Sequence, residues 1–232
     1  MKRILWLGAL LCSALVTLSP GLARAEDTSA PAREQARLIT ATDVLEMLRA
    51  TPDQNVPAWL MQRAYGVAVI PDVLKGAFLF GGRYGNGVLT IRDTQGRFSQ
   101  PVFITLAGGS VGWQIGATST DVVLVFVTQR SVQNFARGKF TLGVDASVAA
   151  GPLGRQGEAA AGVNAEIYSY SRSRGLFAGV ALDGSALRID YDANESIYGK
   201  GITPRRIFEG GVANVPGPVV DFRDRLEEYT QR

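Results

Sequence analysis

A stretch near residue 170 carries the side chains best suited to binding a ligand. Two tyrosines and two arginines occupy alternate positions there: Tyr168, Tyr170, Arg172 and Arg174. Alternate side chains of a β-strand lie on one face, so the pattern predicts a single row of aromatic rings and guanidinium groups. Guanidinium forks match the geometry of phosphate oxygens. We therefore expect this row to bind phosphate groups. The alternative is ordinary tyrosine packing with the arginines paired to acidic neighbours.

A glycine-rich loop offers a second place for an anion. Residues 151–155 read Gly-Pro-Leu-Gly-Arg, and exposed backbone N–H groups in such loops cradle anions. The loop matches neither a P-loop nor a dinucleotide-binding fingerprint, because no Gly-Lys-Ser/Thr follows it and no βαβ unit surrounds it. Arg155 is therefore a candidate to assist the two arginines near residue 170. Tight turns are the alternative explanation for these glycines.

The residue types that the chain lacks exclude most enzymatic chemistry. The 232 residues include no His and one Cys, which removes Ser-His-Asp triads, the usual general base and thiolate zinc sites. Four acidic residues cluster without forming a calcium-loop pattern or a glycosidase pair: Asp183, Asp190, Asp192 and Glu195. We expect a solvated rim there, and no catalytic residue, metal or cofactor. Hydrolysis by carboxylates alone is the enzymatic alternative.

The N-terminal segment has the features of a secretory signal. Lys2 and Arg3 precede an apolar stretch over 4–18, and small residues at positions 23 and 25 fit signal peptidase cleavage after Ala25. The stretch is shorter than the roughly 20 residues that a membrane-spanning helix needs. Cys12 follows two leucines rather than a small residue, which makes a lipoprotein the lesser alternative. We expect an exported protein, periplasmic or peripherally associated with a membrane, from which residues 1–25 are removed.

The net charge gives no support to a polyanionic partner. Lys and Arg number 24 against 21 Asp and Glu, a formal charge of +3. Residues 1–25 hold three of the basic residues and no acidic one, so the rest of the chain is formally neutral. Long-range attraction needs net or strongly segregated charge. We therefore do not expect nucleic acid as a partner, and any anion site must come from a local cluster of cations.

The elements that position these residues follow from the pattern of apolar runs and turns. Small, polar residues predict a flexible lead-in over 26–41, and residues 42–232 are expected to form one domain. Helices are predicted from Asp43, from Pro57, over 130–137, from Thr203 and over 218–230. Short β-branched runs between turn residues predict strands over 67–70, 77–83, 87–92, 101–106, 112–118, 121–128, 140–149, 162–171, 175–182 and 186–191.

This pattern predicts the fold class. The run over 122–127 lacks alternation of apolar and polar residues, which indicates a central strand buried on both faces. The turn signals between the other strands are typical of antiparallel pairing. We expect an α+β fold: a single domain with an antiparallel, partly barrel-like β-core and helices at the N- and C-terminal ends.

Six blocks of sequence resemble one known family. They are Gly66-Val-Ala-Val-Ile-Pro71, residues 81–89, 112–116 and 121–125, residues 143–155 ending in Ala-Ala-Gly-Pro-Leu-Gly-Arg, and residues 167–179 with Ser-Tyr-Ser-Arg-Ser-Arg-Gly-Leu-Phe. In this order they resemble the SYLF-domain family, and the resemblance covers residues 44–210. That family is associated with binding phosphoinositides and other anionic phospholipids, and its fungal members with actin regulation.

The resemblance implies a non-enzymatic domain that recognises anionic, phosphoinositide-like head groups at a membrane surface. In the site that we expect, Arg172 and Arg174 contact phosphate and Arg155 and Lys139 assist. Trp113 or Phe177 contacts the boundary of the acyl chains, and the aromatic rings of the row complete the set: Tyr168 and Tyr170.

Two features limit what the resemblance implies. Eukaryotic relatives are thought to use a basic amphipathic N-terminal segment, whereas here the arginines of the pre-core segment are offset by acids: Arg33, Arg37 and Arg49 by Glu34, Asp43 and Glu46. An exported protein would meet no actin, so we do not expect actin as a partner. The alternative function is a cell-envelope module that binds another protein without specific lipid binding.

Overall fold

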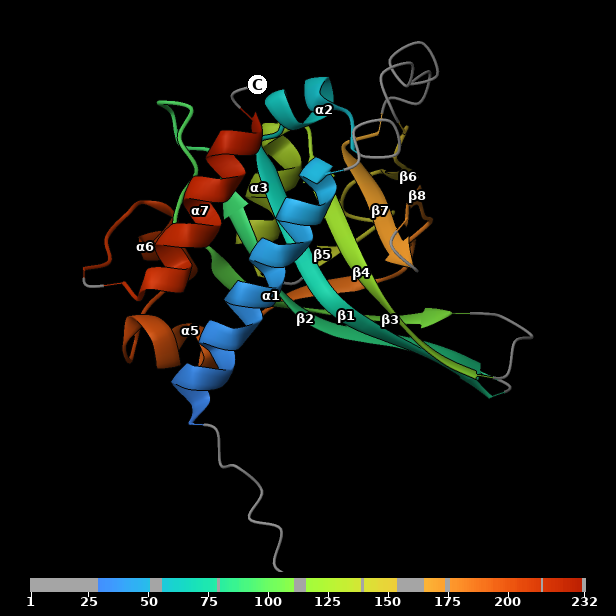
Figure 1. Ribbon diagram of the computed structural model, residues 1–232, viewed down its shortest axis with the longest axis horizontal. Coiled ribbons are helices and arrows are strands. Elements are labelled where there is room, and N and C mark those ends of the chain that lie inside the picture. The colour runs from blue at the N-terminus through green and yellow to red at the C-terminus, as the bar shows by residue number, and fades with distance from the viewer. Residues whose placement is uncertain are drawn as a thin grey trace, which may run out of the picture.

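A twisted sheet of nine strands runs through the described part of the chain. The computed structural model describes residues 29–50, 56–78, 80–110, 116–138, 140–153, 165–173, 176–213 and 215–230. The sheet curls like a half-barrel, and helices lie at both ends of the described chain (Figure 1). The predicted α+β fold with a partly barrel-like β-core is confirmed.

The strand order is β5-β9-β3-β2-β1-β4-β7-β6, and β8 also pairs with β7. Every pair is antiparallel except β6 with β7. The bounds of the strands are β1 Gly66–Phe78, β2 Phe80–Ile91, β3 Val102–Ser110, β4 Gly116–Phe126, β5 Phe140–Thr141, β6 Val148–Ala150, β7 Ile167–Ser173, β8 Leu176–Gly179 and β9 Ala186–Ile189.

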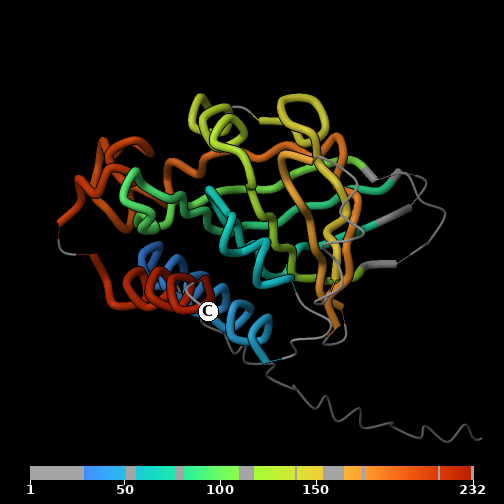
Figure 2. The backbone as a smooth tube through the Cα atoms, turned by 90° about the horizontal axis from the view of Figure 1, so that it is seen from above, coloured from blue at the N-terminus to red at the C-terminus, as the bar shows by residue number. Residues whose placement is uncertain are grey.

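Both faces of the central strands are covered. Helices α1 (Ala30–Ala50) and α7 (Gly217–Thr230) lie side by side on one face, and α3 (Gln129–Ala136) lies on the other (Figure 2). The remaining helices of the described residues are α2 Ala58–Gln62, α5 Tyr191–Tyr198 and α6 Pro204–Phe208. On β4, Val123 and Val125 belong to the core cluster under α1, whereas Val122, Leu124 and Phe126 belong to the opposite cluster. The prediction that 122–127 is central and buried on both faces is confirmed, and α3 confirms the helix predicted over 130–137.

The N-terminal helix begins earlier than the sequence patterns predict. A flexible lead-in was expected over 26–41 and a helix from Asp43, whereas α1 already begins at Ala30 and Asp43 is an exposed residue within it. Glu34 and Leu38 are fully buried in the added turns. The carboxylate of Glu34 is held by Arg37, whose Nη2 lies 2.8 Å from its Oε2. Tertiary contacts therefore hold this part of the chain in a helix despite its small, polar composition.

The first hairpin also differs from the prediction. A strand over 77–83 and a turn at 85–87 were expected, but the chain reverses where Phe78 pairs with Phe80, and Gly85–Gly87 lies inside β2. A β-bulge in β1 explains the glycine, because a Cβ at Gly87 would collide with the backbone oxygen of Val69. The bulge contains Asp72, whose φ of 49° lies in the left-handed region.

Strands β1 to β4 continue past the helices as a projecting extension (Figure 1). We call this extension the β-arm and define it by residues 73–78, 80–85, 107–110 and 116–120. At the other end of the sheet, β9 stops at Ile189 and α5 follows, where the sequence predicts strand to residue 191. The side chain of Asp190 accepts a hydrogen bond from Ala193 N–H (3.1 Å) and caps α5, so it is no free rim carboxylate.

Candidate functional site

The predicted aromatic residues lie in the core beneath α1 and α7. Tyr170 is fully buried, and its hydroxyl donates a hydrogen bond to the carbonyl oxygen of Pro152 at 2.9 Å. Tyr168 and Phe177 keep 7% and 5% of their surface exposed and belong to the same cluster. Burial raises the pKa of the Tyr170 hydroxyl well above its ordinary value. These three rings stabilise the packing of β7 and β8 and offer almost no surface to a ligand.

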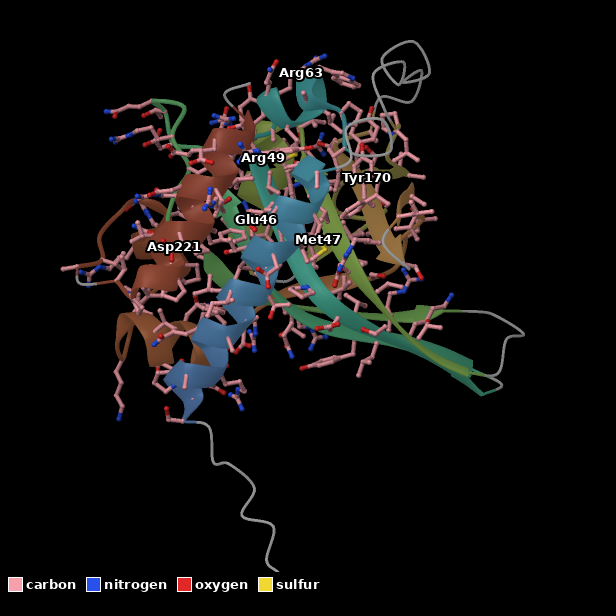
Figure 3. The ribbon with its side chains drawn as sticks, in the orientation of Figure 1. Glu46, Met47, Arg49, Arg63, Tyr170 and Asp221 are labelled. Atoms are coloured by element: carbon pink, nitrogen blue, oxygen red, sulfur yellow. The ribbon has the colours of Figure 1, made fainter. Side chains whose placement is uncertain are left out.

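The predicted phosphate ligand Arg172 is bound by a carboxylate. Its Nε and Nη2 lie 2.7 and 2.6 Å from Oδ2 of Asp121, the residue directly opposite on β4. Its Nη1 contacts the sulfur of Met47 on α1, which lies on the same side of the sheet as Tyr170 (Figure 3). Asp121 is 7% exposed. Arg172 is therefore paired with an acidic neighbour, the alternative to a phosphate ligand that the sequence leaves open. Removing either partner would leave a buried charge.

Four predicted site residues lie outside the described residues: Trp113, Lys139, Arg155 and Arg174. The described part of the glycine-rich loop does have a structural explanation. A Cβ at Gly151 would overlap the ring of Tyr170. Gly151 is therefore explained by close packing against an aromatic ring and not by an anion.

The β-arm carries two cations that form no ion pair with an acidic residue in the described ranges. Lys75 on β1 lies directly opposite Arg83 on β2, so two positive side chains share one face of the hairpin. Lys75 is exposed, Arg83 is half-buried, and neither forms an ion pair among the described residues. Like charges directly opposite each other destabilise a sheet. An anion between them would remove this repulsion.

Arg83 is only partly satisfied within the protein. Its Nη1 donates to the carbonyl oxygen of Ala181 at 3.3 Å, and its buried Nε has no hydrogen-bond partner among the described residues. Burial lowers the pKa of Arg83 from its ordinary value. The guanidinium therefore retains donor capacity for an incoming acceptor.

The arm beyond this pair has no charge in its sequence. Residues 76–82 read Gly-Ala-Phe-Leu-Phe-Gly-Gly, and no charged residue occurs over 98–120. The register places Gly81 opposite Ser110 and Ala77 opposite Gly116, so both uncharged stretches reach the same end of the arm. The result is an apolar end with two cations at its base.

A shallow groove lies between α1 and the base of the arm. Its volume is about 270 Å³, and its lining is Arg37, Thr40, Pro71, Asp72, Leu74, Tyr84, Gly85 and Asn86. The one guanidinium in this lining, that of Arg37, is already held by Glu34 and by Asp190 and lies 5.5 Å above the ring of Phe103. The groove is smaller than the roughly 300–1,000 Å³ of typical small-molecule sites. We therefore do not assign it to an anion.

Two further kinds of site receive no support from the described ranges. No group of three or more acidic residues there is arranged to hold a metal ion. No helix described combines the length and the hydropathy needed to cross a bilayer.

Comparison with known proteins identifies the family. The family described as "Ysc84: Las17-binding protein actin regulator" matches residues 107–229. The chain belongs to this family. It is 42% identical over 181 residues to LAS seventeen-binding protein 3 of Saccharomyces cerevisiae, a match that covers 76% of this chain and 39% of the yeast protein. It is 36% identical over 187 residues to SH3 domain-containing YSC84-like protein 1 of Homo sapiens, covering 79% of this chain and 54% of the human protein.

These findings confirm one expectation and correct another. The resemblance to the SYLF-domain family is confirmed. The expectation that actin is not a partner is wrong for the family, because its description names an actin regulator and its yeast members are named as Las17-binding. The chain spans about 40% to about half of the length of these curated relatives.

The sequence patterns do not single out Lys75 and Arg83 as candidate ligands. The sequence feature that could have identified them is the uncharged stretch 76–82, with one cation just before it and one just after it. A single strand over 77–83, as predicted, does not pair these two cations, whereas the reversal at Phe78–Phe80 brings them together.

Proposed function

We propose that this protein is a non-catalytic binding domain that recognises anionic phospholipid head groups at a membrane surface through Lys75 and Arg83. The observation that carries the proposal is the cation pair on the β-arm, which has no carboxylate partner among the described residues. A phosphate placed between the two side chains neutralises their repulsion and accepts hydrogen bonds from the guanidinium fork. The family description and the name of the yeast relative describe binding proteins, which supports a role without catalysis.

The expected affinity of this pair is modest. Each Lys or Arg near an anionic bilayer contributes about 1 kcal/mol. Two cations therefore contribute about 2 kcal/mol, or roughly thirtyfold in the binding constant. Binding by charge alone is thus weak and falls with salt, because charges on the surface are screened beyond about 8 Å at physiological ionic strength.

Vesicle cosedimentation tests the proposal. The purified protein should sediment with vesicles of phosphatidylcholine and phosphatidylglycerol and not with phosphatidylcholine alone. Lys75→Gln with Arg83→Gln should reduce the bound fraction by at least about tenfold at low salt. The matched control is Arg130→Gln with Arg137→Gln, which removes two exposed arginines, one in α3 and one at its C-cap, that have no ion pair among the described residues. Equal losses in both double variants would contradict the site, since only net charge would then matter.

A second candidate function follows from the family. The description of the family and the name of LAS seventeen-binding protein 3 support binding to an actin-regulatory protein or to actin itself. Cosedimentation of the purified protein with actin filaments, and capture by immobilised Las17, test it directly. Binding to either protein that survives the Lys75→Gln/Arg83→Gln change would assign the protein partner to another surface. No binding to either protein would reject this candidate.

Export remains a proposal of its own. The basic, apolar and small residues of segment 1–25 support a signal that is cleaved after Ala25. The intact mass of the protein recovered from its native host tests this. A mass that corresponds to a chain starting at Glu26 supports export. A mass that corresponds to a chain starting at Met1 or Lys2 contradicts export.

A further inference from the structure

We infer that the apolar end of the β-arm enters the acyl region of the bilayer, so that the protein inserts into the membrane surface instead of only adsorbing to it. The inference rests on the proposed lipid-binding function and adds the mode of contact and the kind of membrane. Its starting point is the arrangement of the arm: an uncharged hairpin end with Phe78 opposite Phe80 and a cation pair just behind it.

The spacing along the strands fits the depth of a membrane interface. Phe78 lies three positions beyond Lys75 on β1, and Phe80 lies three positions before Arg83 on β2. A strand rises about 3.3 Å per residue, so the phenylalanine positions lie about 10 Å beyond the cations. Interfacial elements bury their apolar parts about 5–10 Å below the head groups. Cations at the phosphate level therefore place Phe78 and Phe80 among the acyl chains.

Nothing in the described protein covers the end of the arm on one face. Gly76, Gly82 and Gly109 lie side by side in register on β1, β2 and β3. A Cβ at Gly76 or Gly109 would meet no atom within 4 Å. Two residue pairs closer to the body, Leu74 and Tyr84 are 59% and 52% exposed. Apolar side chains on an uncovered strand surface mark an interaction site, and the uncharged end makes lipid the matching partner.

The backbone limits how deep the arm can go. β9 pairs with β3 only over Ile104–Ala107, and β7 pairs with β4 only from Asp121 onward. The outer edges of the arm thus carry backbone groups with no strand partner among the described residues. Unpaired backbone groups are very costly in the hydrocarbon core. The arm therefore inserts shallowly, at the interface, and does not span the bilayer.

Shallow insertion selects a kind of membrane. A hairpin end needs acyl chains that are exposed between head groups, and such packing defects are most frequent in strongly curved bilayers. The partner is therefore an anionic membrane with packing defects. Phosphate groups free in solution supply only the charge and not the apolar contact.

Two variants separate insertion from adsorption. Phe78→Ser with Phe80→Ser removes the apolar end and keeps both cations, and Val144→Ser removes an apolar side chain that is 78% exposed elsewhere. The assays are the rise in surface pressure of an anionic lipid monolayer, and cosedimentation with small and large anionic vesicles at low and high salt. Circular dichroism melts of all variants check that they are folded.

The expected result is specific. The parent protein and Val144→Ser raise the monolayer pressure, bind small vesicles better than large ones, and keep part of their binding at high salt. The phenylalanine variant keeps its low-salt adsorption within about threefold but loses the salt-resistant binding by at least about tenfold, because burying one phenylalanine is itself a tenfold effect or more.

The outcomes distinguish the two proposals. If the phenylalanine variant raises the monolayer pressure as much as the parent, insertion is overturned, while loss of binding in the Lys75→Gln/Arg83→Gln variant still supports the lipid function. If the parent binds no anionic vesicle at either salt concentration, both proposals are overturned. If free inorganic phosphate at millimolar concentration abolishes binding at high salt, charge alone accounts for binding and insertion is overturned.

Discussion

The basic residues of the chain differ in what lies opposite them. Arg172 faces Asp121, and Arg37 is held between Glu34 and Asp190, so each of these charges is used within the fold. Lys75 instead faces another cation on the neighbouring strand. A residue held in an unfavourable local environment is more often retained for function than for stability. The difference leads to opposite expectations for mutations at these positions.

Lys75→Glu should stabilise the protein and weaken its binding to membranes. An opposite charge facing Arg83 turns a repulsive cross-strand pair into an attractive one, a gain of up to about 1 kcal/mol in the free energy of unfolding. The same change replaces a cation by an anion at the proposed head-group site and should weaken vesicle binding about thirtyfold. Urea unfolding and vesicle cosedimentation measure the two effects. Lys200→Glu, at an exposed position outside the arm, should change neither by a comparable amount.

Arg172→Ala should act on stability and not directly on lipid. The change leaves the buried carboxylate of Asp121 without its partner, which costs about 3 kcal/mol. Folded Arg172→Ala protein should bind vesicles as the parent does, measured at a temperature well below its melting midpoint. A loss of binding in protein shown to be folded would restore Arg172 to the lipid site and contradict a purely structural role for its pair with Asp121.

Gly151→Ala should destabilise the protein through Tyr170. The added methyl group overlaps the buried ring, and such overpacking costs about 1–3 kcal/mol. Gly109→Ala is the matched control, because its methyl group meets no atom within 4 Å. Combining Gly151→Ala with Tyr170→Leu should show a coupling energy in a double-mutant cycle, measured by urea unfolding. Additive effects would mean that the ring is not what excludes the methyl group.

At the scale of elements, α1 sets where the domain begins. Leu38 and Ala41 are fully buried, and Arg37 links α1 to Asp190 at the start of α5. A chain that starts at residue 42 loses these contacts. We expect it to be at least about 3 kcal/mol less stable than a chain that starts at residue 29, since losing one buried leucine alone costs about 2–5 kcal/mol. Equal melting temperatures of the two chains would place the boundary near residue 42, as the sequence patterns alone indicate.

The sequence predicts the strongly patterned elements and misses those that depend on distant contacts. The unbroken apolar run over 122–127 correctly indicates a central strand, and the spacing of Val132 and Phe135 indicates α3. The extent of α1 and the bulge opposite Gly87 depend on packing against other elements, which no local pattern contains. The same holds for the candidate site. Alternation places Arg172 on the same face of β7 as Tyr170, but it cannot show that Asp121 on β4 lies directly opposite and already binds the guanidinium.

At the scale of the whole molecule, one sheet couples two cores. Consecutive residues of β1 point into opposite clusters, with Val67 and Val69 on the side of α1 and Ala68 and Ile70 on the side of α3. If the helices on one face were lost, that face of the central strands would be exposed, and the core cluster on the other face depends on the same strands. The β-arm projects from this doubly covered body, and in the proposed function its direction defines how the molecule meets a membrane (Figure 1).

This geometry predicts one orientation on the membrane, with the arm toward the lipid and α5 toward water. Two single-cysteine variants test it in a Cys12→Ser background: Gly82→Cys on the arm, where a Cβ meets no atom closer than 3.9 Å, and Lys200→Cys, exposed just after α5. An environment-sensitive dye at position 82 should shift to shorter wavelengths on anionic vesicles and become protected from iodide. The dye at position 200 should change little, because α5 lies on the side of the body away from the arm. Equal shifts at both positions, or a shift at position 200 alone, would mean that another face meets the bilayer.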